Sequence, residues 1–167
     1  NGRDISCYGL TDGEGSVVVN GGTQGYGFAW SNSDTDSILN TVGAGTYSVT
    51  VTDVNNCSDT SSITLAQPDS LIAVSSITSD YNGRDISCYG LTDGEGSVVV
   101  NGGTQGYGFA WSNSDTDSIL NNVGAGTYKV TVTDVNNCVD SSEITLTQPD
   151  SFMAVSYTHL RAHETKA

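Results

Sequence analysis

The feature that most constrains the fold is an internal duplication. Residues 1–40 recur without change as residues 82–121, which sets a period of 81 residues. Over the first 75 positions the two copies differ at only eight, among them Ser48, which becomes Lys129, and Ser62, which becomes Glu143. A period near 80 residues exceeds the unit of helical or leucine-rich solenoids and suits a domain with its own core. We therefore expect a row of separate modules joined by linkers.

The pattern within one copy predicts β-strands. Short β-branched and aromatic runs, separated by Gly, Asn and Asp, recur about every ten residues, and no segment shows helical spacing. In residues 46–52, Tyr47, Val49 and Val51 alternate with hydroxylated side chains, which places apolar groups on one face. Further strands are expected at residues 16–20, 26–31, 37–42, 62–66 and 71–78. The prediction is an all-β chain of tandem immunoglobulin-like β-sandwich modules, with six to seven strands each.

Two Gln-Pro-Asp tripeptides, at residues 67–69 and 148–150, interrupt this pattern and predict module boundaries. The first module then covers residues 1–68 and lacks its opening strand, because residues 71–78 open the complete second module at 69–149. Residues 150–156 begin a third module. A sheet without one of its edge strands can accept a strand from a neighbour, so exchange of strands between chains is one hypothesis.

The last eleven residues, 157–167, do not follow the repeat. Residues 155–165, VSYTHLRAHET, resemble the translation of a sequencing adapter, so we interpret 157–167 as a non-native tail. A native basic extension is the alternative. Both histidines, His159 and His163, lie in this tail, and the repeat contains none. The first residue is Asn rather than Met, and we interpret the chain as a fragment of a longer polypeptide.

The charge of the chain argues against several partners. Nineteen acidic residues face five basic ones, for a formal net charge of -14, which repels nucleic acid and anionic lipid. Membrane insertion is not expected either, since no stretch approaches the ~20 apolar residues of a spanning helix. The repeat also lacks a histidine and a nucleophile motif of the G-x-S-x-G type. We therefore expect no enzyme, and whole-unit duplication favours spacing or multivalent binding.

Four cysteines, Cys7, Cys57, Cys88 and Cys138, form no C-x-x-C pair, and disulfides are a better interpretation than zinc. The natural pairing joins Cys7 to Cys57 and Cys88 to Cys138, because each pair lies within one copy. Two other pairings remain open. Closing a loop of roughly 50 residues would contribute about 4 kcal/mol in the chain-entropy model. Disulfides also predict an oxidising, extracellular compartment.

Acidic residues gather in the expected loops and offer the hard oxygen ligands that calcium prefers. The calcium candidates are Asp12, Glu14, Asp34, Asp36, Asp53, Asp93, Glu95, Asp115, Asp117 and Asp134. Their spacing does not fit an EF-hand, and Asp is also an ordinary turn former. We therefore expect that no cofactor is required and keep calcium as a candidate ion.

Three aromatic residues, Tyr26, Phe28 and Trp30, alternate along one expected strand. A solvent-facing row of this kind would form a platform for stacking sugars. However, a Trp on a central strand of an immunoglobulin-like sandwich packs against the opposite sheet. We therefore predict that Trp30 and Trp111 belong to the core, and we keep Tyr26 and Tyr107 as candidate ligand contacts.

Residues 21–57 carry a set of short motifs: Gly-Gly-Thr, an aromatic-x-aromatic-x-Trp run, Ala-Gly-Thr-Tyr-x-Val-x-Val-Thr-Asp and a following Cys. In these motifs the sequence resembles the SprB-type repeat of Bacteroidota surface adhesins, a tandem module similar to immunoglobulin-like and polycystic-kidney-disease-type domains. The resemblance covers nearly all of both modules. It departs at Gln24-Gly25-Tyr26, where the family often has Pro-Pro-Tyr.

The resemblance implies a segment of a very large secreted cell-surface protein, exported by the type IX system and used as a stalk or adhesin array in adhesion or gliding motility. The expected partners are further copies of the module in the same chain, surface glycans or other chains of a filament. Two alternatives stay open. One is a glycan- or calcium-dependent ligand-binding module, and the other is a subunit of an extracellular filament assembled by strand exchange.

Overall fold

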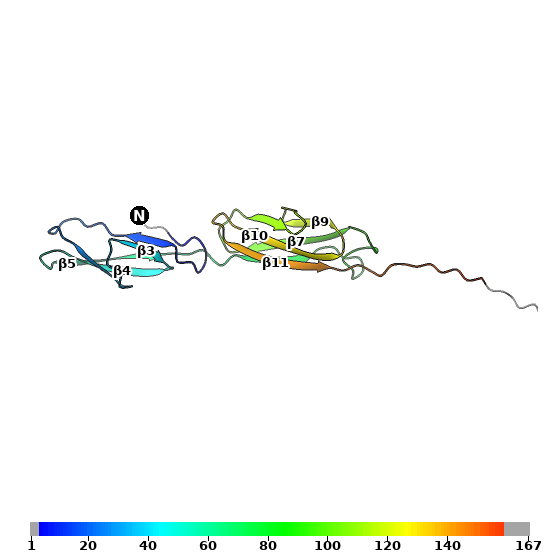
Figure 1. The fold of residues 1–167 in the computed structure, drawn as a ribbon, viewed down its shortest axis with the longest axis horizontal. Coiled ribbons are helices and arrows are strands. Elements are labelled where there is room, and N and C mark those ends of the chain that lie inside the picture. The colour runs from blue at the N-terminus through cyan, green and yellow to red at the C-terminus, as the bar shows by residue number, and fades with distance from the viewer. Residues whose placement is uncertain (1–3, 159–167) are drawn as a thin grey trace, which may run out of the picture.

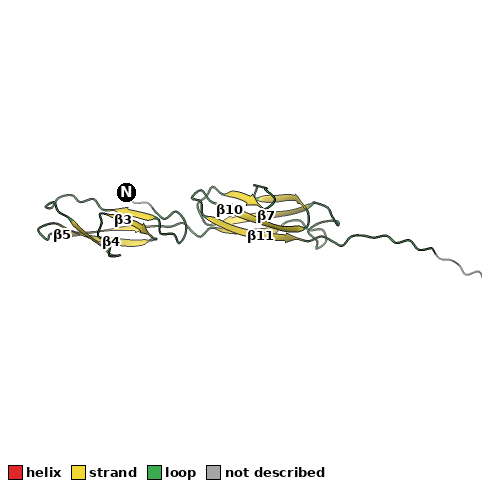
Figure 2. Cartoon of the chain, in the orientation of Figure 1, coloured by secondary structure: helices red, strands yellow, loops and turns green. Residues whose placement is uncertain are grey.

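The structure, a computed structural model, describes residues 4–158. It confirms the all-β prediction: the described residues form eleven strands and no helix (Figure 2). The strands build two immunoglobulin-like β-sandwiches that lie end to end in an elongated chain (Figure 1). Below, the first module denotes β1 to β5 with their loops, and the second module denotes β6 to β11 with theirs.

The first module consists of two antiparallel sheets with the orders β1-β3 and β2-β4-β5. Its strands are β1 (Gly13–Ser16), β2 (Gly27–Trp30), β3 (Ile38–Val42), β4 (Gly45–Thr52) and β5 (Ser58–Leu65). The longest pair is β4 with β5, where Gly45 lies opposite Leu65 and Thr52 lies opposite Ser58. This pair therefore runs along the whole length of the module.

The second module has one strand more, and its sheets have the orders β6-β7-β9 and β8-β10-β11. Its strands are β6 (Ile72–Ile77), β7 (Gly94–Asn101), β8 (Gly108–Trp111), β9 (Ile119–Val123), β10 (Gly126–Thr133) and β11 (Val139–Leu146). The additional strand, β6, pairs with β7 from Ile72 opposite Asn101 to Ile77 opposite Gly96. It also lies against β11 of the facing sheet. Six strands agree with the lower end of the expected number.

The core of each module contains its tryptophan, as the sequence predicts. Trp30 and Trp111 are 5% and 3% exposed. A buried indole needs an acceptor for its N–H, and the ring nitrogens donate to the carbonyl groups of Asp36 (2.8 Å) and Asp117 (2.9 Å). The turns that follow β2 and β8 therefore close onto the tryptophan at the end of each strand and hold it between the two sheets.

One expected strand differs between the two copies. Residues 16–20 are predicted to be extended, but β1 ends at Ser16, whereas its copy β7 continues to Asn101. Residues 13–20 and 94–101 have the same sequence, so propensity cannot explain the difference. In the second module β6 lies alongside the end of β7 and supplies its hydrogen-bond partners. Strand length here depends on the neighbouring strand, which is a common property of β-structure.

Candidate functional site

The two modules meet at a junction formed by the loop that contains Cys7 and the loop that contains Cys138. These cysteines form a disulfide with an S–S distance of 2.03 Å and a Cα–Cα distance of 5.7 Å. The side-chain amide of Asn136 donates a hydrogen bond to the carbonyl of Ser6 (3.1 Å). A covalent bond and a polar contact therefore link the two modules where they face each other.

The loop that presents Cys138 is held by a buried carboxylate. Asp134 is 4% exposed and accepts hydrogen bonds from the backbone N–H groups of Thr104 (2.8 Å), Asn136 (2.8 Å) and Cys138 (2.9 Å). Burial by itself raises the pKa of Asp134, but the three hydrogen bonds outweigh it and hold this pKa below its ordinary value. The loop is therefore organised around an ionised side chain.

The disulfide differs from the pairing expected within each copy. Cys7 bonds to Cys138 of the other module, while Cys57 and Cys88 are exposed thiols. The reason lies in strand β5. Cys57 directly precedes this strand, whereas the segment that leads to Cys7 lies at its other end, where the N–H of Ile5 donates to the carbonyl of Ala66 (2.9 Å). The eight residues of β5 separate the two loops by roughly 25 Å. A disulfide needs Cα atoms within about 7 Å, so the two cysteines of one module cannot meet.

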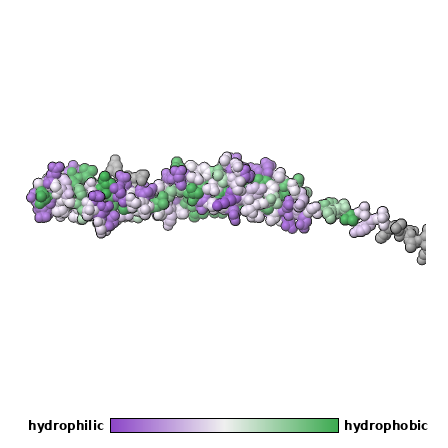
Figure 3. Space-filling view, in the orientation of Figure 1, coloured by the Kyte–Doolittle hydropathy of each residue, from purple (hydrophilic) through white to green (hydrophobic). Residues whose placement is uncertain are grey.

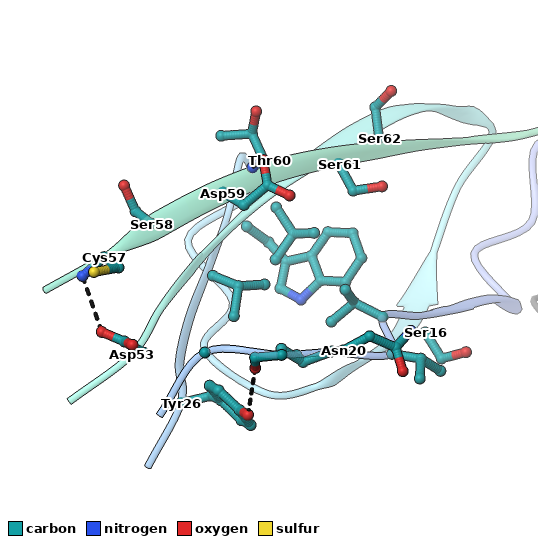
Figure 4. A pocket seen from close by; sticks show the side chains of 18 of the residues that line it. Ser16, Asn20, Tyr26, Asp53, Cys57, Ser58, Asp59, Thr60, Ser61 and Ser62 are labelled. Atoms are coloured by element: carbon teal, nitrogen blue, oxygen red, sulfur yellow. Dashed lines mark hydrogen bonds between the residues drawn. The ribbon is translucent and has the colours of Figure 1, made fainter. Parts of the chain in front are cut away.

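A groove of about 590 Å³ opens along the first module, between the segment that follows β1 and strand β5. Figure 4 shows Ser16 and Asn20 on one side of this groove and the residues from Ser58 to Ser62 on the other. Trp30, Val49 and Ile63 line its floor, so the groove reaches the hydrophobic core. We call it the open groove.

Strand β6 occupies the corresponding place in the second module. The side chains of Val98, Val132 and Ile144 are 6%, 0% and 7% exposed there. Their copies in the first module, Val17, Val51 and Ile63, are only partly buried and line the open groove. The same sequence is therefore covered in one module and uncovered in the other, and the difference is one strand.

Two polar groups of the second module hydrogen-bond to β6. The carboxylate of Asp140 accepts from the N–H of Ala73 (2.8 Å), and the hydroxyl of Ser142 accepts from the N–H of Ser75 (3.1 Å). Their copies, Asp59 and Ser61, line the open groove. These residues do not stand out in the sequence, because they lie in a run of Ser, Thr and Asp that looks like an ordinary exposed strand.

The calcium candidates act mainly in loop turns. Within residues 4–158, the structure brings together no three His, Cys, Asp or Glu side chains that could hold a metal ion. Asp34 and Asp115 accept hydrogen bonds from the N–H groups of Asp36 (3.0 Å) and Asp117 (3.1 Å). Glu14 and Glu95 lie in strands β1 and β7 rather than in loops. Calcium binding at any of them stays a prediction.

The remaining acidic candidates also bind their own loops. Asp12 and Asp93 accept from the N–H groups of Ser6 (3.1 Å) and Ser87 (3.2 Å). A second hydrogen bond, from the hydroxyl of Ser87, is the main reason that the pKa of Asp93 lies below its ordinary value. Asp53 repeats the role of Asp134, and hydrogen bonds from loop N–H groups, first that of Thr23, lower its pKa.

The two candidate ligand-binding tyrosines lie near the turns that contain Gly21 and Gly102. The hydroxyl groups of Tyr26 and Tyr107 donate to the carbonyl groups of Gly21 (2.8 Å) and Gly102 (2.7 Å). Both rings are half-buried, and Tyr26 forms part of the wall of the open groove. A ligand in this groove would contact Tyr26, and a role in glycan binding stays a prediction.

Comparison with known proteins supports the sequence-based family resemblance. The SprB repeat family model matches residues 3–35 and 82–116, at equivalent places in the two copies. Among solved structures, the chain is similar to the amphioxus IgVJ-C2 molecule, with 10% identity, a TM-score of 0.39, and coverage of 81% of this chain and 95% of that one. No curated protein matches the chain. Over residues 4–158, the structure contains no helix that is long and apolar enough to cross a membrane.

Proposed function

We propose that this chain, whose two modules each match the SprB repeat, is a structural and adhesive segment of a large secreted bacterial cell-surface protein. It would act as a stalk or adhesin array, in a protein exported by the type IX system and used in adhesion or gliding motility. The observation that carries the proposal is the disulfide between Cys7 and Cys138, which ties consecutive modules end to end. A disulfide also suits an extracellular location.

The physical task of a stalk is to keep its ends apart, and free hinges between modules would shorten its reach. Two flexibly linked domains rotate against each other unless their interface is large or cross-linked. Here a disulfide and the hydrogen bond between Asn136 and Ser6 restrict that rotation. The net charge of -14 would keep copies of the array soluble at the cell surface. No catalytic activity is part of the proposal.

Small-angle scattering tests the stalk directly. The oxidised chain should keep one extended maximum dimension, and Cys138→Ser should shorten the average dimension by allowing the modules to hinge. Cys57→Ser is the matched control, because it removes an exposed thiol outside the junction. If the oxidised chain and Cys138→Ser have the same distance distribution, the junction does not stiffen the chain and the stalk proposal fails.

The second candidate is a ligand-binding module for glycans, with or without calcium. The observation that favours it is the open groove, whose wall contains Tyr26 and whose floor contains Trp30. Glycan arrays with and without calcium would test it, using Tyr26→Ala and Tyr107→Ala. The second module has no open groove at Tyr107, so only Tyr26→Ala should abolish binding at this site. Equal loss for both variants, or no binding by the wild-type chain, would exclude the groove as a glycan site.

A further inference from the structure

We propose that the outward side of the β6-β7-β9 sheet is a docking surface for the same side of a second copy of this chain, with the two chains packed side by side and antiparallel. This inference goes beyond the stalk proposal, because it assigns a lateral partner to a surface that the junction and the open groove do not use. It rests on the second module, whose two sheets have three strands each.

Four aliphatic side chains form one stripe across the outer side of this sheet. They are Ile72 and Val74 of β6, Val99 of β7 and Ile119 of β9, which are 48%, 51%, 58% and 50% exposed. Val74 lies directly opposite Val99 in the sheet, which places their Cβ atoms about 5 Å apart. Ile119 lies opposite Ser97, so it is a diagonal neighbour within reach of Val99. We call this stripe the apolar face.

The side chains of the apolar face point away from the core. Their neighbours in the chain, Ala73, Val98 and Leu120, are 7%, 6% and 0% exposed, and successive residues of a strand point to opposite sides of the sheet. Figure 3 shows hydrophobic residues in small groups among hydrophilic ones over the side of the molecule that it presents. A continuous stripe of large aliphatic groups on one sheet, in contrast, is typical of a surface that contacts another protein.

The other outer face of the same module shows that the fold does not require aliphatic side chains on its surface. The outward positions of β10 and β11 carry mostly hydroxylated and charged side chains: Thr127, Lys129, Thr131, Ser141, Glu143 and Thr145. The hydroxyl groups of Thr127 and Thr145 share a hydrogen bond across the two strands (2.9 Å), and Lys129 lies opposite Glu143. The aliphatic stripe is therefore a property of one sheet rather than of the sandwich.

The charge of the chain selects the partner. The net charge is -14, so two copies repel each other wherever their acidic residues meet. The apolar face has no charged side chain, and beside it the hydroxyl groups of Ser76 and Ser97 bond to each other (3.3 Å). A basic partner would find no carboxylate in this stripe, whereas a second copy brings an equally uncharged and apolar surface. Two such sheets can pack as aligned layers about 10 Å apart, as the layers of a β-sandwich do.

The β6 edge of this sheet is closed to a strand from another chain, which leaves the face for docking. An edge strand offers unpaired N–H groups to which a neighbouring chain can bind. In β6, however, the N–H groups of Ala73 and Ser75 donate to the side chains of Asp140 (2.8 Å) and Ser142 (3.1 Å). A second copy therefore meets this part of the module through the side chains of the apolar face.

One carboxylate sets the direction of the pair. Glu95 is exposed and lies on the same side of β7 as Val99, because side chains alternate along a strand. Asn101, at the other end of β7, lies about 20 Å from Glu95 on that side. In a parallel pair the two Glu95 side chains would meet, whereas in an antiparallel pair each lies near Asn101 of the other chain. The antiparallel pair avoids the contact of like charges, and in the proposed stalk it would join chains that extend from facing cell surfaces.

Sedimentation equilibrium of the oxidised full-length chain tests the pairing, with the exposed thiols of Cys57 and Cys88 alkylated so that no disulfide joins two chains. We expect a reversible monomer–dimer equilibrium that strengthens with added salt, because salt screens the repulsion between acidic chains and leaves an apolar contact in place. Val99→Asp should weaken association by about tenfold or more, because each dimer would bury the new carboxylate twice. Val139→Asp is the matched control: Val139 is 61% exposed on the outward side of β11, and association should be unchanged.

Two further variants separate folding from docking and report the direction of the pair. Val99→Thr keeps a β-branched side chain in the strand, so it should weaken association in a chain whose circular dichroism is unchanged. Asn101→Lys should strengthen an antiparallel pair, because the new ammonium group lies near Glu95 of the other chain, and it should weaken a parallel pair, where two ammonium groups meet. Ser141→Lys makes the same change in net charge on the other sheet and should have the smaller effect.

Three outcomes would overturn the pairing: a chain that stays monomeric at the highest concentration at which it is soluble, association that added salt weakens, or equal effects of the two aspartate variants. Weaker association of Asn101→Lys would overturn the antiparallel direction. A monomeric chain would leave the stalk proposal standing, because the stiffness of the Cys7–Cys138 junction is a property of the single chain.

Discussion

Alanine substitutions at Gly21 and Gly102 compare one change in two environments. Both glycines have a left-handed backbone, with φ of 82° and 67°, so alanine carries a strain of about 1 kcal/mol at each. At Gly21 the added methyl group meets no atom within 4 Å. At Gly102 it overlaps the carbonyl of Ser70, a backbone atom that cannot rotate away. Overpacking of this kind adds roughly 1–3 kcal/mol.

Gly21→Ala should therefore destabilise the first module by about 1 kcal/mol, and Gly102→Ala the second by about 2–4 kcal/mol. Hydrogen exchange resolved by peptide mass spectrometry would assign each loss to its module, with β4 and β10 as reporters. For a domain near 80 residues, 1 kcal/mol corresponds to a shift in Tm of about 4–8 °C. Equal losses at the two glycines would refute the idea that β6 alone distinguishes the modules.

Three further outcomes are expected. Cys138→Ser should accelerate amide exchange in the two junction loops while leaving the strand cores protected. Asp134→Asn should cost about 1–3 kcal/mol at neutral pH. Hydrogen bonds lower the pKa of Asp134 below 3.8 in the folded state, so the stability that its ionised side chain contributes is complete above pH 3.8 and is lost as the pH falls below that value. Asp134→Asn should therefore show a shallower loss of Tm in acid than the wild-type chain. Val98→Ala should destabilise its module more than Val17→Ala does, by denaturant unfolding followed with module-resolved exchange, because only Val98 is covered by a strand.

The sequence predicts most of the fold because its signals are local. Alternation in residues 46–52 predicts the strand observed as β4 (Gly45–Thr52), and the place of Trp30 on a central strand of an immunoglobulin-like sandwich predicts its burial. Strand β5 begins at Ser58, four residues before the predicted start at residue 62, because backbone pairing with β4 extends it through polar residues. Backbone pairing leaves no mark in the hydrophobic pattern, so such extensions are not visible in a single sequence.

The junction could not be predicted in the same way, because it depends on which end of a module each loop occupies. Proximity along the repeat favours a bond between Cys7 and Cys57, yet β5 runs between them and carries them to opposite ends. The topology of the sandwich has to be known before the partner of either cysteine can be chosen. The hydrogen bonds of Asp140 and Ser142 could not be predicted for a related reason, since both residues accept from β6, and their copies Asp59 and Ser61 have no such strand beside them.

The Gln-Pro-Asp tripeptide at residues 67–69 lies between the end of β5 and the start of β6, so it joins the first module to the strand that covers the second. Strand β6 lies in the second module, but the linker that leads into it begins where the first module ends, at Gln67, whose side chain accepts from Gly9 (2.8 Å) beside the loop of Cys7. Gln148 makes the same contact with Gly90 (2.8 Å). The residues that deliver a covering strand are therefore fastened to the loop that delivers a cysteine. Because one segment positions both, the covering of the second module by β6 and the alignment of Cys7 with Cys138 depend on the same linker.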